Sequence, residues 1–347
     1  MFFEAILPSH STTPTLPGSE LTNLEKDHAI LTLRQTIGPQ AASLEDDHLR
    51  QFLLANAWNL EGAQRQLQNA LLWRAQQGAD DFPVATKTNK LPLLVSVRGY
   101  EYVEDGHVQS DPRLSEAAVR IINHMGGSCF HKFDKEGHPV LIDRTGHHQM
   151  KEIGSDITDE ELTNFQLACN EFLHRVLLAE ATDRTQHSVT RETVIADCSD
   201  MGLWQFHMNG LLKVKLVADH FQAHYPETLH RLFIVNAPSA FLVMWKVIKP
   251  WLDKRTLDKV HILGKDYRDV LLKYIDEDAL PSYLGGNCTC SHLPGGCAPS
   301  VHDGSIPMLE KSSHNLVSEN PYNPDIMAQA KADPGLRKVA KRTVASK

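Results

Sequence analysis

Near its beginning the chain has apolar positions that recur at the spacing of helices with one buried face. Residues 22–37 form one such segment, which Gly38 ends. Residues 60–76 form another, in which apolar side chains recur three and four residues apart, and Gly78 ends it. We therefore expect an all-helical unit over residues 21–90.

The middle of the chain alternates short runs rich in valine, isoleucine and leucine with longer segments of helical periodicity. The predicted strands cover residues 139–143, 193–196, 232–235 and 260–263. The predicted helices cover residues 158–181, 211–221, 241–251 and 267–274. Strands that alternate with helices at this spacing pair in parallel through right-handed crossovers. The pattern predicts an α/β domain over residues 91–290.

Both ends of the chain lack this periodicity. Residues 1–20 are rich in serine, threonine and proline, and we expect them to be disordered. Residues 291–347 are rich in glycine, proline, serine and asparagine, and we expect a mostly irregular tail. From Lys331 onward this tail is basic, which indicates either a solvated end or a contact with an anionic membrane surface.

Composition narrows the classes of function. The 347 residues carry a formal net charge of −8, and the pI near 6.2 argues against a general nucleic-acid binder. No stretch approaches the roughly 20 apolar residues of a membrane span. The short apolar run at residues 2–7 has no basic residue before it, unlike a secretion signal. We expect a cytoplasmic protein whose six cysteines are mainly reduced.

Sequence motifs typical of enzymes are missing. The chain has no G-x-S-x-G, P-loop, G-x-G-x-x-G or H-E-x-x-H pattern. Asp197 ends a predicted strand, where α/β enzymes keep their sites. With Asp200 it forms either a metal-binding pair or, more simply, a turn and a helix cap. We therefore expect a protein that binds a ligand and is not an enzyme.

Nineteen histidines and a group of cysteines raise the question of a metal. His220 and His224 share one helix face, but no third ligand follows at a readable spacing. Three cysteines and two histidines lie close together near the end of the α/β domain: Cys288, Cys290, Cys297, His292 and His302. Three thiols and one imidazole can form a zinc site, although C-x-C is short for a standard zinc turn. We expect no metal, and the cysteines remain the open alternative.

The most apolar of the predicted helices is the one at residues 241–251. Five large side chains make up most of its apolar surface: Phe241, Met244, Trp245, Ile248 and Trp251. Lys246 and Lys249 form a narrow basic edge. One interpretation is a core helix that covers the sheet. The other is a lid over an apolar cavity that dips into a membrane, because aromatic and lysine side chains suit an interfacial helix.

Five motifs follow one another in the second half of the chain. They are HYPE at 224–227, FIVNAP at 233–238, IKPWL at 248–252, KVHILG at 259–264 and LPSYLGG at 280–286. Their order and spacing resemble the CRAL-TRIO lipid-binding domain, in its phosphatidylinositol-transfer (Sec-fourteen-like) branch. Residues 49–78 resemble the helical N-terminal unit of this family, and residues 131–140 resemble its first strand.

The resemblance implies a helical unit followed by a two-layer α/β domain with a mostly parallel sheet. It also implies a gating helix, at 241–251, over an apolar pocket. The protein would enclose one membrane lipid and exchange it with a bilayer, or present it there to lipid kinases, without a cofactor. In members that carry phosphatidylinositol, the headgroup lies near positions that match Glu227, Thr256 and Lys259.

The chain departs from the family at positions that bear on the ligand. A basic pair linked to phosphoinositides falls on Asn56 and Ala57. The polar positions that hold the choline headgroup phosphate in some members fall on Glu192 and Val194. Phosphatidylinositol is therefore the expected ligand. The alternative is haem or another hydrophobic ligand in the same fold, and a hydrolase is the third hypothesis.

Overall fold

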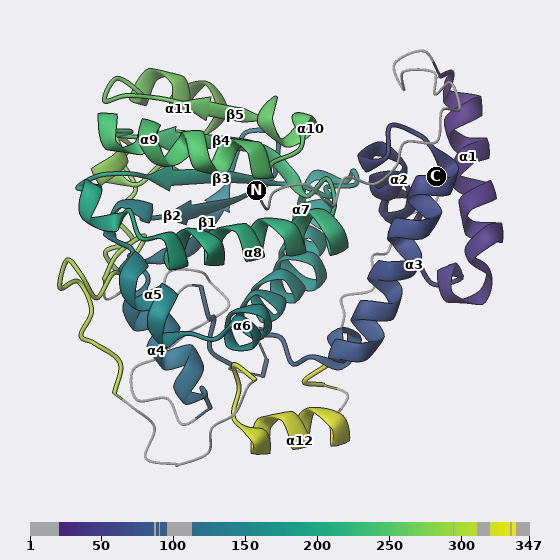
Figure 1. The fold of residues 1–347 in the computed structure, drawn as a ribbon, viewed down its shortest axis with the longest axis horizontal. Coiled ribbons are helices and arrows are strands. Elements are labelled where there is room, and N and C mark those ends of the chain that lie inside the picture. Colours follow the sequence, from purple (N-terminus) through teal and green to yellow (C-terminus); the bar gives the residue numbers. More distant parts are fainter. Residues whose placement is uncertain are drawn as a thin grey trace, which may run out of the picture. The chain divides into compact units, whose positions relative to one another are not determined.

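The computed structural model describes residues 21–86, 88–89, 91–95, 113–293, 295–310, 320–333 and 335–337. The expected disordered segment 1–20 and most of the basic tail lie outside these residues. The chain divides into two compact units, residues 1–69 and residues 70–347. The division falls within one helix, α3 (Leu60–Gln77), whereas the sequence analysis ended the helical unit at residue 90 (Figure 1).

The first unit consists of α1 (Asn23–Ile37), α2 (Asp46–Ala55) and the start of α3. The Thr22 hydroxyl accepts from the Glu25 N–H, and the Glu25 carboxylate accepts from the Thr22 N–H, so a capping box begins α1. The buried apolar side chains of this unit are Ile30, Leu33, Ile37, Ala41, Leu49, Phe52, Leu53, Ala63 and Leu67. Helical periodicity predicted α1 and α3 to within one residue at each end.

The second unit is an α/β domain on a five-stranded sheet of order β1-β2-β3-β4-β5 (Figure 1). The strands are β1 (Ser128–Phe133), β2 (Pro139–Asp143), β3 (Glu192–Asp197), β4 (Leu229–Val235) and β5 (Val260–Ile262). The helices are α4 (Glu116–His124), α5 (Met150–Asp156), α6 (Asp159–Phe172), α7 (Leu178–Thr185), α8 (Met208–His224), α9 (Ser239–Ile248), α10 (Lys254–Leu257), α11 (Arg268–Tyr274) and α12 (Pro324–Ala332). β1 pairs antiparallel with β2, and the other neighbours pair in parallel. The predicted α/β domain with a mostly parallel sheet is confirmed.

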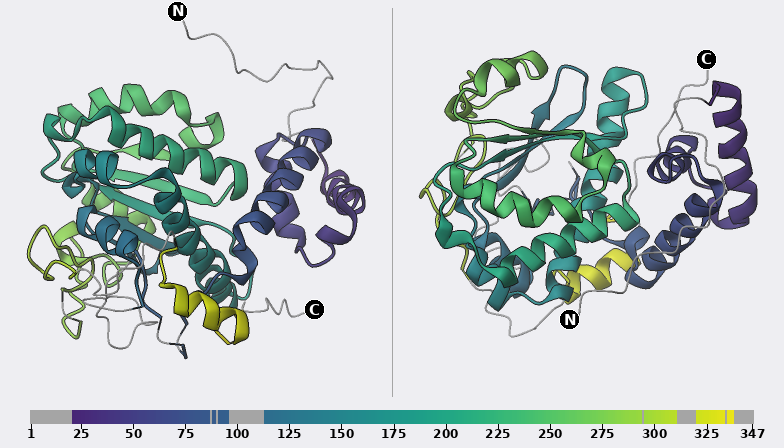
Figure 2. Two further views of the ribbon diagram at one scale, coloured as in Figure 1. Left: turned by 60° about the horizontal axis from the view of Figure 1, so that its bottom comes forward. Right: turned by 45° about the horizontal axis from the view of Figure 1, so that its top comes forward.

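The two faces of the sheet contact different parts of the domain, because successive side chains of a strand point to opposite faces. One face contributes Phe130, Leu141, Val194 and Leu232 to the wall of a cavity. The other face packs against α11 through Cys129, Ile142, Ile195, Phe233 and Leu271. Figure 2 shows helices on both sides of the sheet.

The long helix predicted at residues 158–181 is interrupted. A π-helical turn at Leu173–Leu177 joins α6 to α7. Just before this turn the fully buried Glu171 carboxylate accepts hydrogen bonds of 2.8 Å from both Arg74 Nη1 and the Tyr225 hydroxyl. A buried carboxylate is stable only with such partners. This network therefore ties the last part of α3, from residue 70 onward, and the end of α8 to α6.

The C-terminal region contains a helix that the sequence analysis did not predict. α12 begins after Asn323, whose side chain accepts from the Ile326 N–H at 2.9 Å. Just before it, the buried Tyr322 forms an isolated β-bridge with Leu114. Asparagine before a proline is a common helix start, so the Asn323-Pro324 pair was the signal that could have found α12.

Candidate functional site

A cavity of about 430 Å³ lies between the sheet and helices α5, α6 and α8. Its wall is mainly apolar, and the apolar side chains that line it include Ile121, Met125, Phe130, Leu141, Met150, Ile153, Ile157, Leu162, Leu173, Val194, Val214, Val217, Phe221 and Leu232. A cavity of this size is within the usual range for small-molecule sites. An apolar wall favours a hydrophobic ligand over a charged metabolite, because a charge would lose its hydration there.

Asp143, which ends β2, is the centre of a polar group in the cavity wall. His148 Nε2 lies 3.1 Å from its carboxylate, and the hydroxyls of Ser128 and Thr145 donate to it. Burial would raise the pKa of Asp143, but His148 and the two hydroxyls lower it. The Gly126 N–H donates to His148 Nδ1 at 2.7 Å, so the ring proton is on Nε2. Ser128 thus donates to the carboxylate and not to the histidine, unlike the serine of a hydrolase triad.

Glu192, at the start of β3, is a second carboxyl in the cavity wall. Its side chain is buried, and Oε2 has no hydrogen-bond partner among the described residues. Burial raises the pKa of Glu192 to about 8. The neutral acid therefore predominates at pH 7, and it can donate one hydrogen bond to a ligand and accept another.

The structure brings two of the three predicted headgroup residues together. Lys259 Nζ lies 2.9 Å from Glu227 Oε2. Thr256 instead forms part of the cap of α10, where its N–H and its hydroxyl donate to Asp253 at 2.9 and 2.7 Å. None of the three is among the described residues that line the cavity. Glu227 and Lys259 therefore form a polar site outside the cavity wall, and Thr256 stands beside it in a helix cap.

Two arginines that the sequence analysis did not identify complete a basic cluster around Glu227. Arg255 Nε lies 2.5 Å from Glu227 Oε1, and Arg191 Nη2 lies 3.7 Å from Oε2. Burial would raise the pKa of Glu227, but hydrogen bonds from Arg255 and Lys259 lower it. Three cations against one carboxylate leave an excess of positive charge. Such a cluster can bind a phosphate group.

Backbone pairing connects this basic cluster to the cavity. The Glu192 N–H donates to the Thr228 carbonyl at 2.8 Å. Arg191 and Glu227, the residues immediately before these two, both belong to the basic cluster. The side chain of Glu192 lines the cavity, which agrees with the alternation of side chains along an extended segment. The cluster and the cavity thus lie on either side of one backbone segment.

The five predicted gate residues share one apolar face of α9 and the turn after it. They are Phe241, Met244, Trp245, Ile248 and Trp251. Leu211 of α8 and Ile234 of β4 are their buried partners. None of the five is among the described residues that line the cavity, whereas α8 contributes Val214, Val217 and Phe221. In this structure α8 directly covers the cavity, and α9 packs against α8.

Large apolar side chains are exposed on α8, on α9 and on the 3₁₀ turn before α8. They are Leu203, Trp204, Met208, Leu212, Leu242 and Val243, with exposed fractions from 48% to 68%. Lys246 and Lys249 are exposed at the end of α9. Exposed apolar side chains beside lysines are typical of surfaces that contact lipid or protein. Among the described helices, none combines the length and the hydropathy needed to cross a bilayer.

Two other metal candidates from the sequence have structural roles. The Asp197 carboxylate accepts from the N–H and the hydroxyl of Ser199 and from the Asn236 amide. It therefore anchors the turn after β3. His224 stacks on Trp73, with ring centroids 4.0 Å apart and planes at 7°. Asn56, which the resemblance matched to a basic residue, donates to the Phe52 carbonyl at 2.9 Å and so ends α2.

Comparison with known proteins gives the following matches. Residues 123–286 match the family model described as CRAL/TRIO domain. Phosphatidylinositol/phosphatidylcholine transfer protein SFH11 of Arabidopsis thaliana is 32% identical over 253 residues, 72% of this chain and 60% of that protein. Sec14 cytosolic factor of Schizosaccharomyces pombe is 27% identical over 254 residues, 73% of this chain and 78% of that protein.

The extent of these matches differs among the relatives. The chain spans between 38% and 60% of the length of four Arabidopsis transfer proteins. The crystal structure of Sfh5 matches 90% of this chain and 98% of its own chain, at 14% identity and a TM-score of 0.49.

Proposed function

Since the chain carries a CRAL/TRIO domain at residues 123–286, we propose that it encloses one membrane lipid and exchanges it with, or presents it at, a bilayer. The observation that carries this proposal is the mainly apolar cavity of about 430 Å³. Exposing acyl chains to water costs about 0.8 kcal/mol per CH₂, or roughly 25 kcal/mol for about 30 methylenes. A carrier therefore has to enclose the chains, and an apolar cavity does so at little net cost.

We propose an inositol phospholipid as the lipid. Arg191, Arg255 and Lys259 supply positive charge for a phosphate, and the Glu227 carboxylate can accept hydrogen bonds from ring hydroxyls. At the position where some family members hold the choline phosphate, Glu192 offers a single donor when neutral and repels the phosphate when ionised. The names of the Arabidopsis relatives, phosphatidylinositol/phosphatidylcholine transfer proteins, agree with the phospholipid class.

The proposed place of exchange is the cytoplasmic surface of a membrane, with transient contact. The apolar side chains exposed on α8 and α9, Leu212 and Leu242 among them, would enter the interface, while Lys246 and Lys249 face anionic headgroups. Movement of α8 and α9 as a pair would open the cavity, because they share an apolar core. Lipid kinases that use the presented lipid are the proposed partners.

We propose that the protein binds its lipid without catalysing a reaction, and the polar residues of the cavity wall support this. Ser128 and His148 both donate to Asp143, so no base is aimed at the serine. His148 is the one histidine among the described residues that line the cavity, and both of its ring nitrogens have hydrogen-bond partners. A haem in this cavity would therefore have to break one of these bonds to gain an imidazole ligand.

The first experiment is native mass spectrometry of the full chain, followed by denaturing extraction and identification of the ligand. We expect about one phospholipid per chain, and uptake from liposomes once the ligand has been removed. The absorbance band of haem in the purified protein would instead identify haem, the alternative ligand. A protein that holds no lipid after purification and takes none from liposomes would rule out the proposal.

A further inference from the structure

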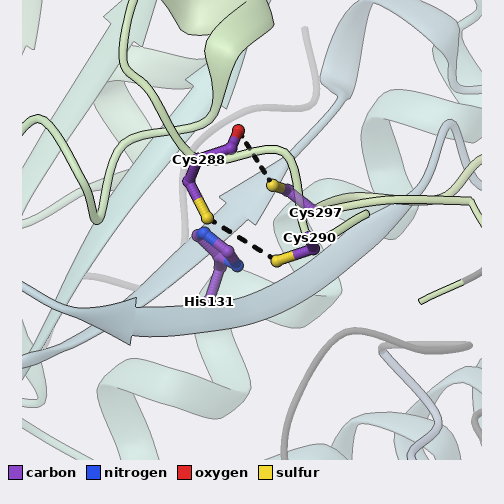
Figure 3. A group of neighbouring side chains, drawn as sticks. All are labelled: His131, Cys288, Cys290 and Cys297. Atoms are coloured by element: carbon purple, nitrogen blue, oxygen red, sulfur yellow. Dashed lines mark hydrogen bonds between the residues drawn. The ribbon is translucent and has the colours of Figure 1, made fainter. Parts of the chain in front are cut away.

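Four side chains that the proposed lipid site does not use come together beside β1: His131, Cys288, Cys290 and Cys297 (Figure 3). His131 belongs to β1, and the cysteines come from the loop that follows α11. Their ligand atoms all lie within 4.8 Å of one another. All four residues are buried, with exposed fractions from 1% to 9%. In Figure 3 the imidazole lies next to the sulfur atoms.

The spacing of the sulfur atoms matches a metal site and not a disulfide. Cys288 Sγ and Cys290 Sγ lie 3.6 Å apart. A disulfide bond requires about 2.05 Å, so these two thiols are free. In a tetrahedral zinc site with Zn–S bonds of about 2.3 Å, neighbouring sulfur atoms are about 3.8 Å apart. The observed separation is therefore close to one edge of such a tetrahedron.

His131 provides a second, independent observation. Only 1% of it is exposed, yet neither ring nitrogen has a hydrogen-bond partner among the described residues. Buried polar atoms nearly always have a partner, because burying one without a hydrogen bond costs free energy. A metal ion bound to one ring nitrogen would supply the missing interaction.

The backbone of the loop holds the cysteines in this arrangement. The Cys288 N–H donates to the Leu280 carbonyl at 3.0 Å, which fixes the first cysteine. Gly295 and Gly296 have φ angles of +84° and +70°, which residues other than glycine rarely adopt. This turn returns the chain, so that Cys297 Sγ lies 3.3 Å from the Cys288 carbonyl oxygen. The loop is thus shaped to bring its last cysteine back to the first.

A second group with metal-ligand side chains lacks these features. Glu136, His138 and His230 also lie close together, but the Glu136 carboxylate is exposed and pairs with Arg231 at 2.7 Å. The two rings stack on each other, with centroids 3.8 Å apart. This group is satisfied by an ion pair and ring stacking, whereas the ring of His131 is not satisfied.

We propose that His131, Cys288, Cys290 and Cys297 bind one zinc ion in a closed, structural site. Three thiolates and one imidazole are a common donor set for structural zinc. Magnesium and calcium bind thiolates poorly, because they prefer oxygen ligands. Each thiol releases its proton to solvent as it binds the ion. With four protein ligands the ion has no open position for a substrate. Its role is to hold the loop against β1, whatever ligand the cavity takes.

The test is the metal content of the full chain, without a polyhistidine tag, purified under reducing conditions without chelators. Elemental analysis should find about one zinc per chain in the wild type. His131→Ala and Cys290→Ser should each retain less than about a tenth of that after dialysis. Cys198→Ala, which removes a buried thiol outside the cluster, is the matched control and should keep the full content.

A second measurement on the wild type does not depend on whether the variants fold. When cobalt replaces zinc, tetrahedral thiolate coordination should give strong visible absorption bands. Three of the six cysteines should also react with a thiol reagent only after a chelator has removed the ion. A wild type without zinc and with all cysteines reduced, a disulfide within the cluster, or full zinc retention in both ligand variants would overturn the proposal.

Discussion

The Glu192 N–H donates to the Thr228 carbonyl at 2.8 Å. The backbone segment that carries this bond lies between two chemically different sites. On one side is the carboxyl of Glu192 in an apolar cavity. On the other is Glu227, the residue before Thr228, surrounded by three cations. Only one backbone segment lies between the two sites, so substitutions in the basic cluster and in the cavity wall test the two ends of one proposed lipid site.

The first prediction concerns selection of the headgroup. Lys259→Ala removes a largely buried cation that lies 2.9 Å from Glu227. Losing one partner of such a pair costs about 2–5 kcal/mol, so transfer of phosphatidylinositol should fall by at least about tenfold. Transfer of lipids with other headgroups should change much less, because their chains occupy the same apolar cavity. Transfer of radiolabelled phosphatidylinositol and phosphatidylcholine between vesicles measures both effects.

Lys254→Ala is the matched control for this experiment. Lys254 begins α10, five residues before Lys259, but it is exposed, and among the described residues its ion-pair partner is Asp258 alone, at 2.7 Å. Exposed pairs contribute about 0–1 kcal/mol, so the transfer rates of this variant should equal those of wild type. Equal losses for both lipids in Lys259→Ala would indicate damaged folding. No loss for either lipid would make Glu227 and Lys259 an ordinary surface pair.

The second prediction concerns the dependence of stability on pH. The pKa of Glu192 is about 8 in the folded protein, against 4.5 without burial. Well below pH 4.5 the carboxyl is neutral in both the folded and the unfolded state. As pH rises from 4.5 toward 8 the protein loses stability, because only the unfolded state ionises freely. Glu192→Gln stays neutral throughout. In the lipid-free protein its free energy of unfolding should match wild type at pH 4 and exceed it by about 4 kcal/mol at pH 8. Denaturant titrations at both pH values measure this, and a constant difference would contradict it.

The third prediction concerns contact with the bilayer. Leu242 on α9 is 50% exposed, so Leu242→Asp should leave the fold intact. If α9 enters the membrane interface, the added charge should slow lipid exchange by about tenfold, because charges enter a bilayer at high cost. Leu72→Asp makes the same change at a 60% exposed leucine on α3 and serves as control. Equal exchange rates for the two variants would show that α9 does not enter the bilayer.

Trp245→Asp extends the same test to the inner side of α9. Trp245 is half-buried and stacks on Phe241, with ring centroids 5.9 Å apart. We expect exchange to slow by more than about tenfold, because the charge disturbs both the bilayer contact and the packing of α9. Circular dichroism of the variant separates loss of fold from loss of exchange. A folded variant with the wild-type rate would make α9 an ordinary core helix.

The fourth prediction concerns the buried network around Glu171. Glu171→Gln removes the fully buried carboxylate that lies 2.8 Å from Arg74 and leaves this guanidinium with only the exposed Asp80 among its described carboxylate partners. Breaking a buried ion pair by removing one partner costs about 3–5 kcal/mol. The midpoint of denaturation should therefore fall markedly, while Arg65→Ala, which loses only an exposed pair with Glu61, should change little. Similar midpoints for the two variants would contradict the assigned role of Glu171.

Local patterns in the sequence predicted most of the fold, because each strand and helix carries its own periodicity. Runs such as residues 139–143 and 232–235 are apolar enough to identify buried strands without their partners. The sites were harder to predict, because they depend on residues far apart in the chain. Arg191 meets Glu227 only through the pairing of β3 with β4. Likewise, sequence proximity placed His292 and His302 near the cysteines, whereas the fold places His131 there.

β1 also has a consequence for how the protein is made. Leu280, Leu284 and Ala298 share a buried core with Cys129 of β1, yet they are synthesised long after that strand. At a synthesis rate of about 5–20 residues per second, the residues that bury this face of β1 are made on the order of ten seconds after the strand itself. As the edge strand of the sheet, it is meanwhile a template for pairing with other chains. A message truncated before the codon for Leu280 should therefore give a product that aggregates or needs a chaperone.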